Sequence, residues 1–280
     1  MTTSTTSQQQ QEEPALPPPA TQQAKPAVRR LGDRIFSGTA LGAGIIILLV
    51  LAAVAVFLVA QSIPGLSTDD NTILRGRSFL EYVVPLAFGT VWASLIALVI
   101  AAPIAIGIAL FISHYAPRRF AAVLGYVIDL LAAVPSVVFG LWGAVTLAGF
   151  VQPFYAWLGA NLGWFPLFSG QASATGNTIL TASLVLAVMI LPIMTAICRE
   201  VFLQAPRLHE EAALALGATR WEMIRMAVLP FARGGMVSAA MLALGRALGE
   251  TMAVKMVLSV SGVISVELLT STNPTTIPAN

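Results

Sequence analysis

Residues 211–230 read EAALALGATRWEMIRMAVLP and form a long charged segment between the apolar runs of this chain. Only 10% of the 280 residues are charged, yet five charges fall in or just beyond this segment. They are Glu211, Arg220, Glu222, Arg225 and Arg233. The chain is 57% hydrophobic, with a mean hydropathy of +0.82. Because a soluble domain of this size needs far more charge to cover its surface, the composition predicts a membrane protein.

Five apolar runs are long enough to cross a bilayer as helices. They are predicted at about 36–60, 83–112, 120–150, 178–198 and 234–260. The fold class is therefore predicted as an all-α, polytopic helical bundle, with 199–233 as a loop between the last two spans. Residues 31–280 form this transmembrane domain. Residues 1–30, rich in Gln, Pro and Thr, are predicted to be a disordered cytoplasmic tail.

The distribution of Lys and Arg orients these spans. Eleven basic residues fall on one side: Lys25, Arg29, Arg30, Arg34, Arg118, Arg119, Arg199, Arg207, Arg220, Arg225 and Arg233. On the other side lie only Arg75 and Arg77. The excess predicts that the amino terminus and the 199–233 loop face the cytoplasm of a bacterial cell.

The 199–233 loop is predicted to contain a short helix that ends in a turn. Glu211 is placed near the start of this helix, where an acid complements the helix dipole. The alanines that follow are strong helix formers, and Gly217 ends the helix and permits a sharp turn. Pro230 then marks the beginning of the next span. A short rigid helix of this kind is suited to transmit a movement from another protein. The alternative is that the segment is a solvated amphipathic helix in a loop.

Two charges lie inside the last predicted span. At about 1.5 Å per residue from Pro230, Arg246 lies about 24 Å along the helix and Glu250 about 30 Å. Charges at such depth face a bundle interior or a water-filled path. Being four residues apart, the two can pair on one helix face. They are therefore either a structural ion pair or a cationic site for an anion, since the planar fork of Arg binds phosphate-like oxygens in a bidentate way.

Other segments carry weaker signals. The outer segment 151–177 contains six aromatic residues, which indicate an interfacial aromatic belt or, alternatively, a docking surface for a soluble binding protein. His114 and His209 are lone histidines in predicted cytoplasmic loops and are expected to be exposed. No metal site is predicted, and no Gly-rich Lys loop that would hold ATP occurs in the chain.

Five segments together resemble the permeases of ATP-binding-cassette phosphate importers, of the PstC type. They are residues 85–90, 115–119, 131–143, 211–230 and 245–254, and the likeness runs from about residue 30 to 270. The 211–230 stretch is similar to the cytoplasmic EAA coupling loop of these permeases, apart from Ala227, where the family usually has Ile. The residues that match the loop pattern are Glu211, Ala212, Ala213, Gly217, Leu229 and Pro230.

This resemblance implies a MetI-like bundle of six spans, so that one span is expected beyond the five visible here. It implies a heterodimer with a PstA-type permease, a cytoplasmic ATPase dimer that binds the ATP, and an external phosphate-binding protein. It also implies phosphate as substrate, with Arg246 and Glu250 acting in its passage, membrane lipids as surroundings, no nucleic-acid partner, and no catalytic residue or bound cofactor in this chain. The alternatives are a sulfate or molybdate permease, an ATP-independent secondary transporter or channel, and a membrane-embedded enzyme, for which no reactive constellation is found.

Overall fold

The computed structural model describes residues 31–66, 79–258, 265–271 and 276–279, and it contains no strand in these ranges. The predicted tail at 1–30 lies outside the described residues, as do Arg75 and Arg77. The helices are α1 (Leu31–Leu66), α2 (Phe79–Leu110), α3 (Arg118–Ala132), α4 (Ser136–Trp142), α5 (Ala148–Leu162), α6 (Ile179–Leu203), α7 (Arg207–Ala215), α8 (Arg220–Met223), α9 (Leu229–Leu248) and α10 (Met252–Val257). Three π-helical turns join some of them: η1 (Phe111–Tyr115), η2 (Gly143–Leu147) and η3 (Ile224–Val228).

The first helix belongs to a unit of its own, Met1–Thr68. α1 is 36 residues long and apolar all round, so no single face is reserved for a protein core. By length and composition its Arg34–Ile63 part can cross a membrane, and this part contains the span predicted at 36–60.

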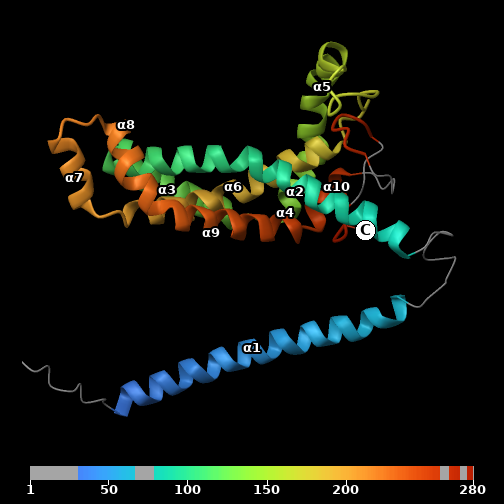
Figure 1. Cartoon of the computed structure of the whole chain (residues 1–280). Coiled ribbons are helices and arrows are strands. Elements are labelled where there is room, and N and C mark those ends of the chain that lie inside the picture. Colours follow the sequence, from blue (N-terminus) through green and yellow to red (C-terminus); the bar gives the residue numbers. More distant parts are fainter. Residues whose placement is uncertain (1–30, 67–78, 259–264, 272–275, 280) are drawn as a thin grey trace, which may run out of the picture. The chain divides into compact units, whose positions relative to one another are not determined.

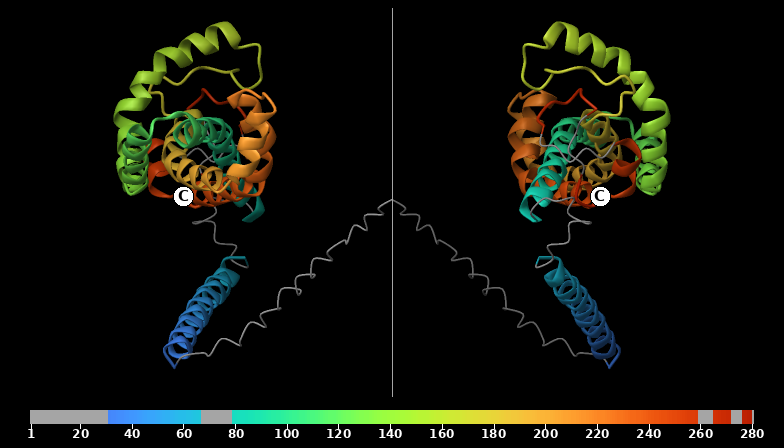
Figure 2. Two further views of the ribbon diagram at one scale, coloured as in Figure 1. Left: turned by 90° about the vertical axis from the view of Figure 1, so that its left-hand side faces the viewer. Right: turned by 90° about the vertical axis from the view of Figure 1, so that its right-hand side faces the viewer.

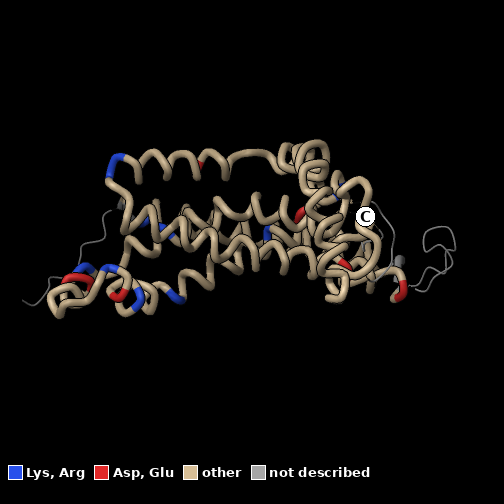
Figure 3. The backbone as a smooth tube through the Cα atoms, turned by 90° about the horizontal axis from the view of Figure 1, so that it is seen from above, with Lys and Arg blue, Asp and Glu red and all other residues tan. Residues whose placement is uncertain are grey.

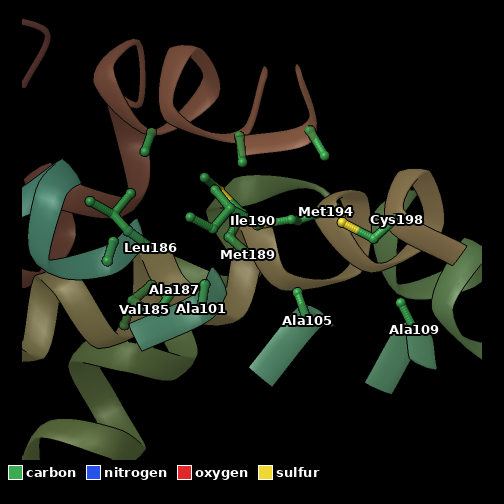
Figure 4. Close-up of a cluster of buried hydrophobic side chains, with 14 of the residues drawn as sticks. Ala101, Ala105, Ala109, Val185, Leu186, Ala187, Met189, Ile190, Met194 and Cys198 are labelled. Atoms are coloured by element: carbon green, nitrogen blue, oxygen red, sulfur yellow. The ribbon is translucent and has the colours of Figure 1, made fainter. Parts of the chain in front are cut away.

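The second unit, Asp69–Asn280, is a bundle in which α2, α6 and α9 pack together (Figure 1). α2 turns a stripe of alanines toward α6, and these side chains are fully buried. They are Ala93, Ala97, Ala101, Ala105 and Ala109. From α6, residues such as Met189, Ile190 and Met194 fill the space opposite (Figure 4). Small residues at every fourth position let two membrane helices approach closely, which places α6 at the centre of the core.

The run predicted as one span at 120–150 is broken into separate helices. α3 ends at Ala132, and Ala133 and Val134 donate backbone hydrogen bonds to Leu130 and Leu131, three residues back. Pro135 follows, which has no N–H and disfavours a helical conformation in the residue before it. Length and composition mark Ser136–Leu162 as a membrane-crossing candidate. However, α3 and α4 run along the bundle, whereas α5 turns away from its axis at one end (Figures 1 and 2).

The segment predicted as a loop at 199–233 is mostly helical. α6 continues to Leu203, α7 and α8 follow, and η3 leads without interruption into α9. The membrane-crossing candidates in this half are Ile179–Leu203 and Arg220–Leu248. The last predicted span, 234–260, is interrupted because α9 ends at Leu248 and α10 begins only at Met252; residues 259–260 lie outside the described ranges.

Candidate functional site

α9 and α10 form a discontinuous helix, broken at residues 249–251. The break begins where the amides of Gly249 and Glu250 bond to Gly245 and Ala247, at 3.2 and 3.3 Å. Glu250 then accepts a hydrogen bond on Oε1 from the amide of Ala253, at 3.1 Å. Its side chain is only 8% exposed. The Glu250 carboxylate therefore caps the first turn of α10 from inside the protein.

α4 and the start of η2 pack on α10 through two glycines, Gly140 and Gly143. A Cβ atom on Gly140 would lie 2.6 Å from the Cα of Ala253, and one on Gly143 would lie 3.3 Å from Cγ2 of Val257. The two short helices thus run in the same direction with a shared register. Extending that register back by one turn sets Ser136, which follows the break at Pro135, beside the break that starts at Gly249. The break at Pro135 and the break at Gly249 therefore lie at about the same level of the bundle. Together they are called the double break.

This close packing predicts a strong effect of Gly140→Ala. The added methyl group meets a backbone atom of Ala253, so α4 and α10 must separate, at a cost of about 1–3 kcal/mol. We expect a lower thermal unfolding temperature and a lower yield of purified protein. Gly149→Ala is the matched control, because a Cβ there meets nothing within 4 Å. Equal unfolding temperatures for the two variants would contradict the packing described here.

Arg246 lies in the last turn of α9, where a cation is favourable for the helix dipole. Its side chain is exposed and lines a pocket of about 460 Å³ with Ile193, Met241, Leu242 and Gly245. The ion pair with Glu250, one of the two alternatives that the sequence leaves open, does not form. Because the helix ends at Leu248, Glu250 leaves the face that Arg246 occupies and turns into the protein. Among the described residues Arg246 has no ion-pair partner.

α7 lies at the opposite end of the bundle and buries none of its residues. Leu208 is 75% exposed and Leu216, just after the helix, 90% exposed. The sequence alone did not single out these two residues. The signal that could have identified them is a Leu near each end of a short helix within a charged loop. Glu211 occupies the fifth position of α7 and not its start, because the helix begins directly after Pro206; Glu210 is the acid of the first turn.

The turn after α7 has the geometry predicted for it. Gly217 has φ +87°, a left-handed conformation that favours glycine, and its amide bonds to Leu214. Thr219 and Glu222 then form a capping box at the start of α8, with the Thr219 amide donating to Oε2 of Glu222 at 2.8 Å. Pro230 lies in the first turn of α9, directly after η3.

His114 was expected to be exposed, and this expectation is wrong. In η1, its side chain is 10% exposed, and its Nε2 lies 3.7 Å from Oε1 of Glu210 on α7. The Oγ of Ser113 lies 2.6 Å from Nδ1 and orients the ring. No local sequence pattern indicates this contact, because Glu210 is far from His114 along the chain. His209 on the same helix is exposed, as expected.

Charge is unevenly distributed over the bundle. Lys and Arg gather at the end that carries α7 and α8, and most of the bundle length is uncharged (Figure 3). Within the described residues no group of three or more His, Cys, Asp or Glu could hold a metal ion. The two features with functional character are thus an unpaired Arg246 beside a double helix break, and a protruding helix at the basic end.

Comparison with known proteins gives consistent matches. The family model described as "Binding-protein-dependent transport system inner membrane component" matches residues 101–278. "Phosphate transport system permease protein PstC 2" of Mycobacterium tuberculosis is 49% identical over 239 residues, covering 82% of this chain and 74% of the relative. "Phosphate transport system permease protein PstC" of Mycobacterium leprae is 47% identical over 241 residues, covering 82% and 76%. The protein of that name from Mesorhizobium japonicum is 40% identical over 273 residues, covering 89% and 82%.

Proposed function

This chain belongs to the family of binding-protein-dependent transport system inner membrane components, and from that premise we propose that it is the membrane-spanning permease of an ATP-driven phosphate importer. It is a multi-pass membrane protein and a transport subunit. The observation that carries the phosphate assignment is the 40–49% identity to relatives named as phosphate permeases, over more than four fifths of the chain. Sulfate and molybdate are not favoured as substrates.

α7 and the turn at Gly217 are the docking site for the cytoplasmic ATPase dimer in this proposal. The support is geometric: α7 protrudes, buries none of its residues and presents Leu208 and Leu216 at its two ends. Small residues between them, Ala212 and Ala213, let a groove close over the helix. Glu211 adds a negative charge on the same short helix. Leu229 and Pro230 are the first two residues of α9.

Two connections carry a push on α7 into the bundle. One is the contact of Glu210 with His114, at the end of α2. The other runs through α8 and η3, which are continuous with α9 and so with Arg246 and the break beyond it. ATP binding to the partner ATPase thereby changes access to the double break. This chain needs no bound cofactor for that step.

At the double break, Arg246 offers its guanidinium fork to the oxygens of phosphate, as a cation with no competing partner within the described residues. Discontinuous helices form the substrate sites of many transporters, because their free backbone groups face the path. Glu250 supports this arrangement by capping α10 rather than by touching the ion. A PstA-type second permease closes the path from the side on which Arg246 is exposed.

The proposed orientation puts the α7–α8 end in the cytoplasm of a bacterial cell, since basic residues gather at that end of the bundle. The amino terminus is assigned to the cytoplasm from its sequence, because Lys25, Arg29 and Arg30 precede the first span. The α5–α10 end then faces outward, toward the phosphate-binding protein.

The test of this function is uptake of labelled phosphate by cells that lack their own phosphate permeases. The chain is supplied with its second permease, ATPase and binding protein, and an inactive ATPase serves as control. We expect ATP-dependent uptake that excess sulfate and molybdate do not inhibit. Uptake with the inactive ATPase would point to a secondary transporter, and transport of sulfate or molybdate without phosphate would reassign the substrate.

The His114–Glu210 contact yields a prediction for coupling. We expect His114→Ala and Glu210→Ala each to lower substrate-stimulated ATP hydrolysis by about two- to fivefold, since a partly exposed pair contributes up to about 1 kcal/mol. The double variant should be no worse than either single one, because both remove the same contact. His209→Ala, on the exposed side of the same helix, is the matched control. Additive losses in the double variant would argue that the two residues act separately.

A further inference from the structure

α5 has two distinct faces. Its exposed face carries Phe150, Phe154 and Trp157, which are 80%, 56% and 55% exposed, and Trp164 just beyond the helix continues it at 81%. These positions recur at helical spacing, and Phe154 stacks on Trp157 with ring centroids 6.1 Å apart. A contiguous aromatic surface of this kind marks an interaction site and is not a feature of a water-exposed helix.

The opposite face ties α5 to the bundle. Tyr155 is 1% exposed, and its hydroxyl lies 3.0 Å from Oγ1 of Thr181, in the first turn of α6. Thr181 also donates to the carbonyl oxygen of Gly176, at 2.6 Å. Leu158 packs with Tyr155 against Leu269. The aromatic face is therefore held in a fixed position relative to α6, the most buried helix of the core.

α5 and the segments next to it along the chain are uncharged. No Asp, Glu, Lys, Arg or His occurs between Asp129 and Arg199. Along the chain, the exposed face of α5 continues the exposed side of α4 and η2, where Leu141 is 57% and Val145 72% exposed. The aromatic face of α5 therefore continues the apolar surface of the bundle that crosses the membrane.

We propose that the aromatic face of α5 lies in the interfacial region of the lipid bilayer, at the α5–α10 end of the bundle, and is covered by phospholipid. Trp favours this zone, where its ring lies near the headgroups, and Phe is typical of the buried face of helices that lie in the interface. Because α5 turns away from the bundle axis (Figure 1), it lies along the membrane surface and does not extend into water. Through Tyr155 and Thr181, the lipid contact fixes the outer end of α6. The inference rests on the membrane-spanning bundle alone and not on the transported ion.

A soluble binding protein is the competing occupant of this face, and the structure favours lipid over it. Protein docking surfaces pair an apolar centre with a polar and charged rim. Here α5, α4 and η2 carry no charged residue, the carboxylate of Glu267 lies beside Gly170 and not on α5, and the apolar surface of α5 continues along the chain into α4. The continuity is what a lipid-covered surface requires.

Spin labels measure the environment of α5 in the complete transporter, reconstituted in phospholipid. Cys198 is the only cysteine of this chain, so Cys198→Ala provides a background free of native thiols, with the cysteines of the partner chains replaced. One label is placed at Asn161→Cys, on the aromatic face, and the control label at Ala174→Cys, exposed in the segment that precedes α6. Collision rates with lipid-soluble oxygen and with a water-soluble nickel chelate are compared.

We expect the ratio of oxygen to nickel collisions to be several-fold higher at 161 than at 174. Equal ratios, or a label at 161 shielded from both reagents, would overturn the proposal, since the face would then be covered by water or by protein. In a second arm, the phosphate-binding protein is titrated onto complexes carrying Phe154→Ser with Trp157→Ser. An unchanged dissociation constant supports the lipid assignment, and binding weakened by about tenfold or more would assign the face to that protein instead.

Discussion

Replacing Arg246 by Gln is expected to lower phosphate uptake by roughly 100-fold while the transporter still assembles. A hydrogen bond to a charged group contributes about 1.5–3 kcal/mol, and Gln retains neither the charge nor the fork that holds two phosphate oxygens. Assembly survives because the side chain is exposed in the pocket beside Met241 and Gly245 and has no ion-pair partner within the described residues. Initial uptake rates and co-purification of the partner subunits measure the two effects.

Two further substitutions sharpen this result. Arg246→Lys keeps the charge but presents it as a point, so we expect intermediate uptake. Arg233→Gln removes an exposed Arg from the other end of the same helix and should leave uptake unchanged. Normal uptake by Arg246→Gln, or an equal loss in Arg233→Gln, would remove Arg246 from the phosphate path.

Gly217→Val is expected to uncouple the ATPase from transport. Gly217 adopts φ +87°, where a β-branched residue is strained, so the turn after α7 must change shape. A Cβ at this position meets nothing within 4 Å, so the effect is conformational and not a steric clash. We expect uptake to fall by about five- to thirtyfold, with the ATPase either lost from the purified complex or insensitive to substrate, since about 1–2 kcal/mol is required to hold a non-glycine residue in this region.

Gly217→Asn is the control for this turn, because Asn tolerates the left-handed conformation better than other residues. We expect it to retain most of the uptake. If Asn and Val impaired coupling equally, the requirement at 217 would be for a bare backbone that a partner contacts closely, and the φ angle would not be the cause.

The features predicted well from the sequence are those that local chemistry dictates. The long apolar runs at α1, α2 and α6 fixed the class of fold, and Gly217 was placed correctly because a glycine after an alanine-rich helix is a local signal. The break at Gly249 was missed, since Glu250 and Thr251 interrupt an otherwise apolar pattern only briefly. The burial of His114 was missed for another reason: its partner Glu210 is brought near by the packing of α7 against η1, which no local pattern encodes.

The separation of Arg246 from Glu250 is a second feature that no local sequence pattern encodes. Spacing alone favours an ion pair, but the helix ends between the two residues and Glu250 finds the amide of Ala253 instead. The local sequence does not show that α9 stops at Leu248, just before the segment of α10 that packs on Gly140. The sequence therefore predicts Arg246 and Glu250 as candidate site residues, but it does not predict their relative geometry.

The uncharged stretch between Asp129 and Arg199 also bears on how the protein is made. In the proposed orientation, the segment that joins α4 to α6 crosses the bilayer during synthesis, before the bundle exists to shelter it. Each Arg, Lys or Asp at the membrane centre costs about 2.5–3.5 kcal/mol on the insertion scale. A segment free of such residues is translocated without that cost. α5 and the loop that follows it can therefore reach the outer side of the membrane early and fold there while α9 is still being synthesised.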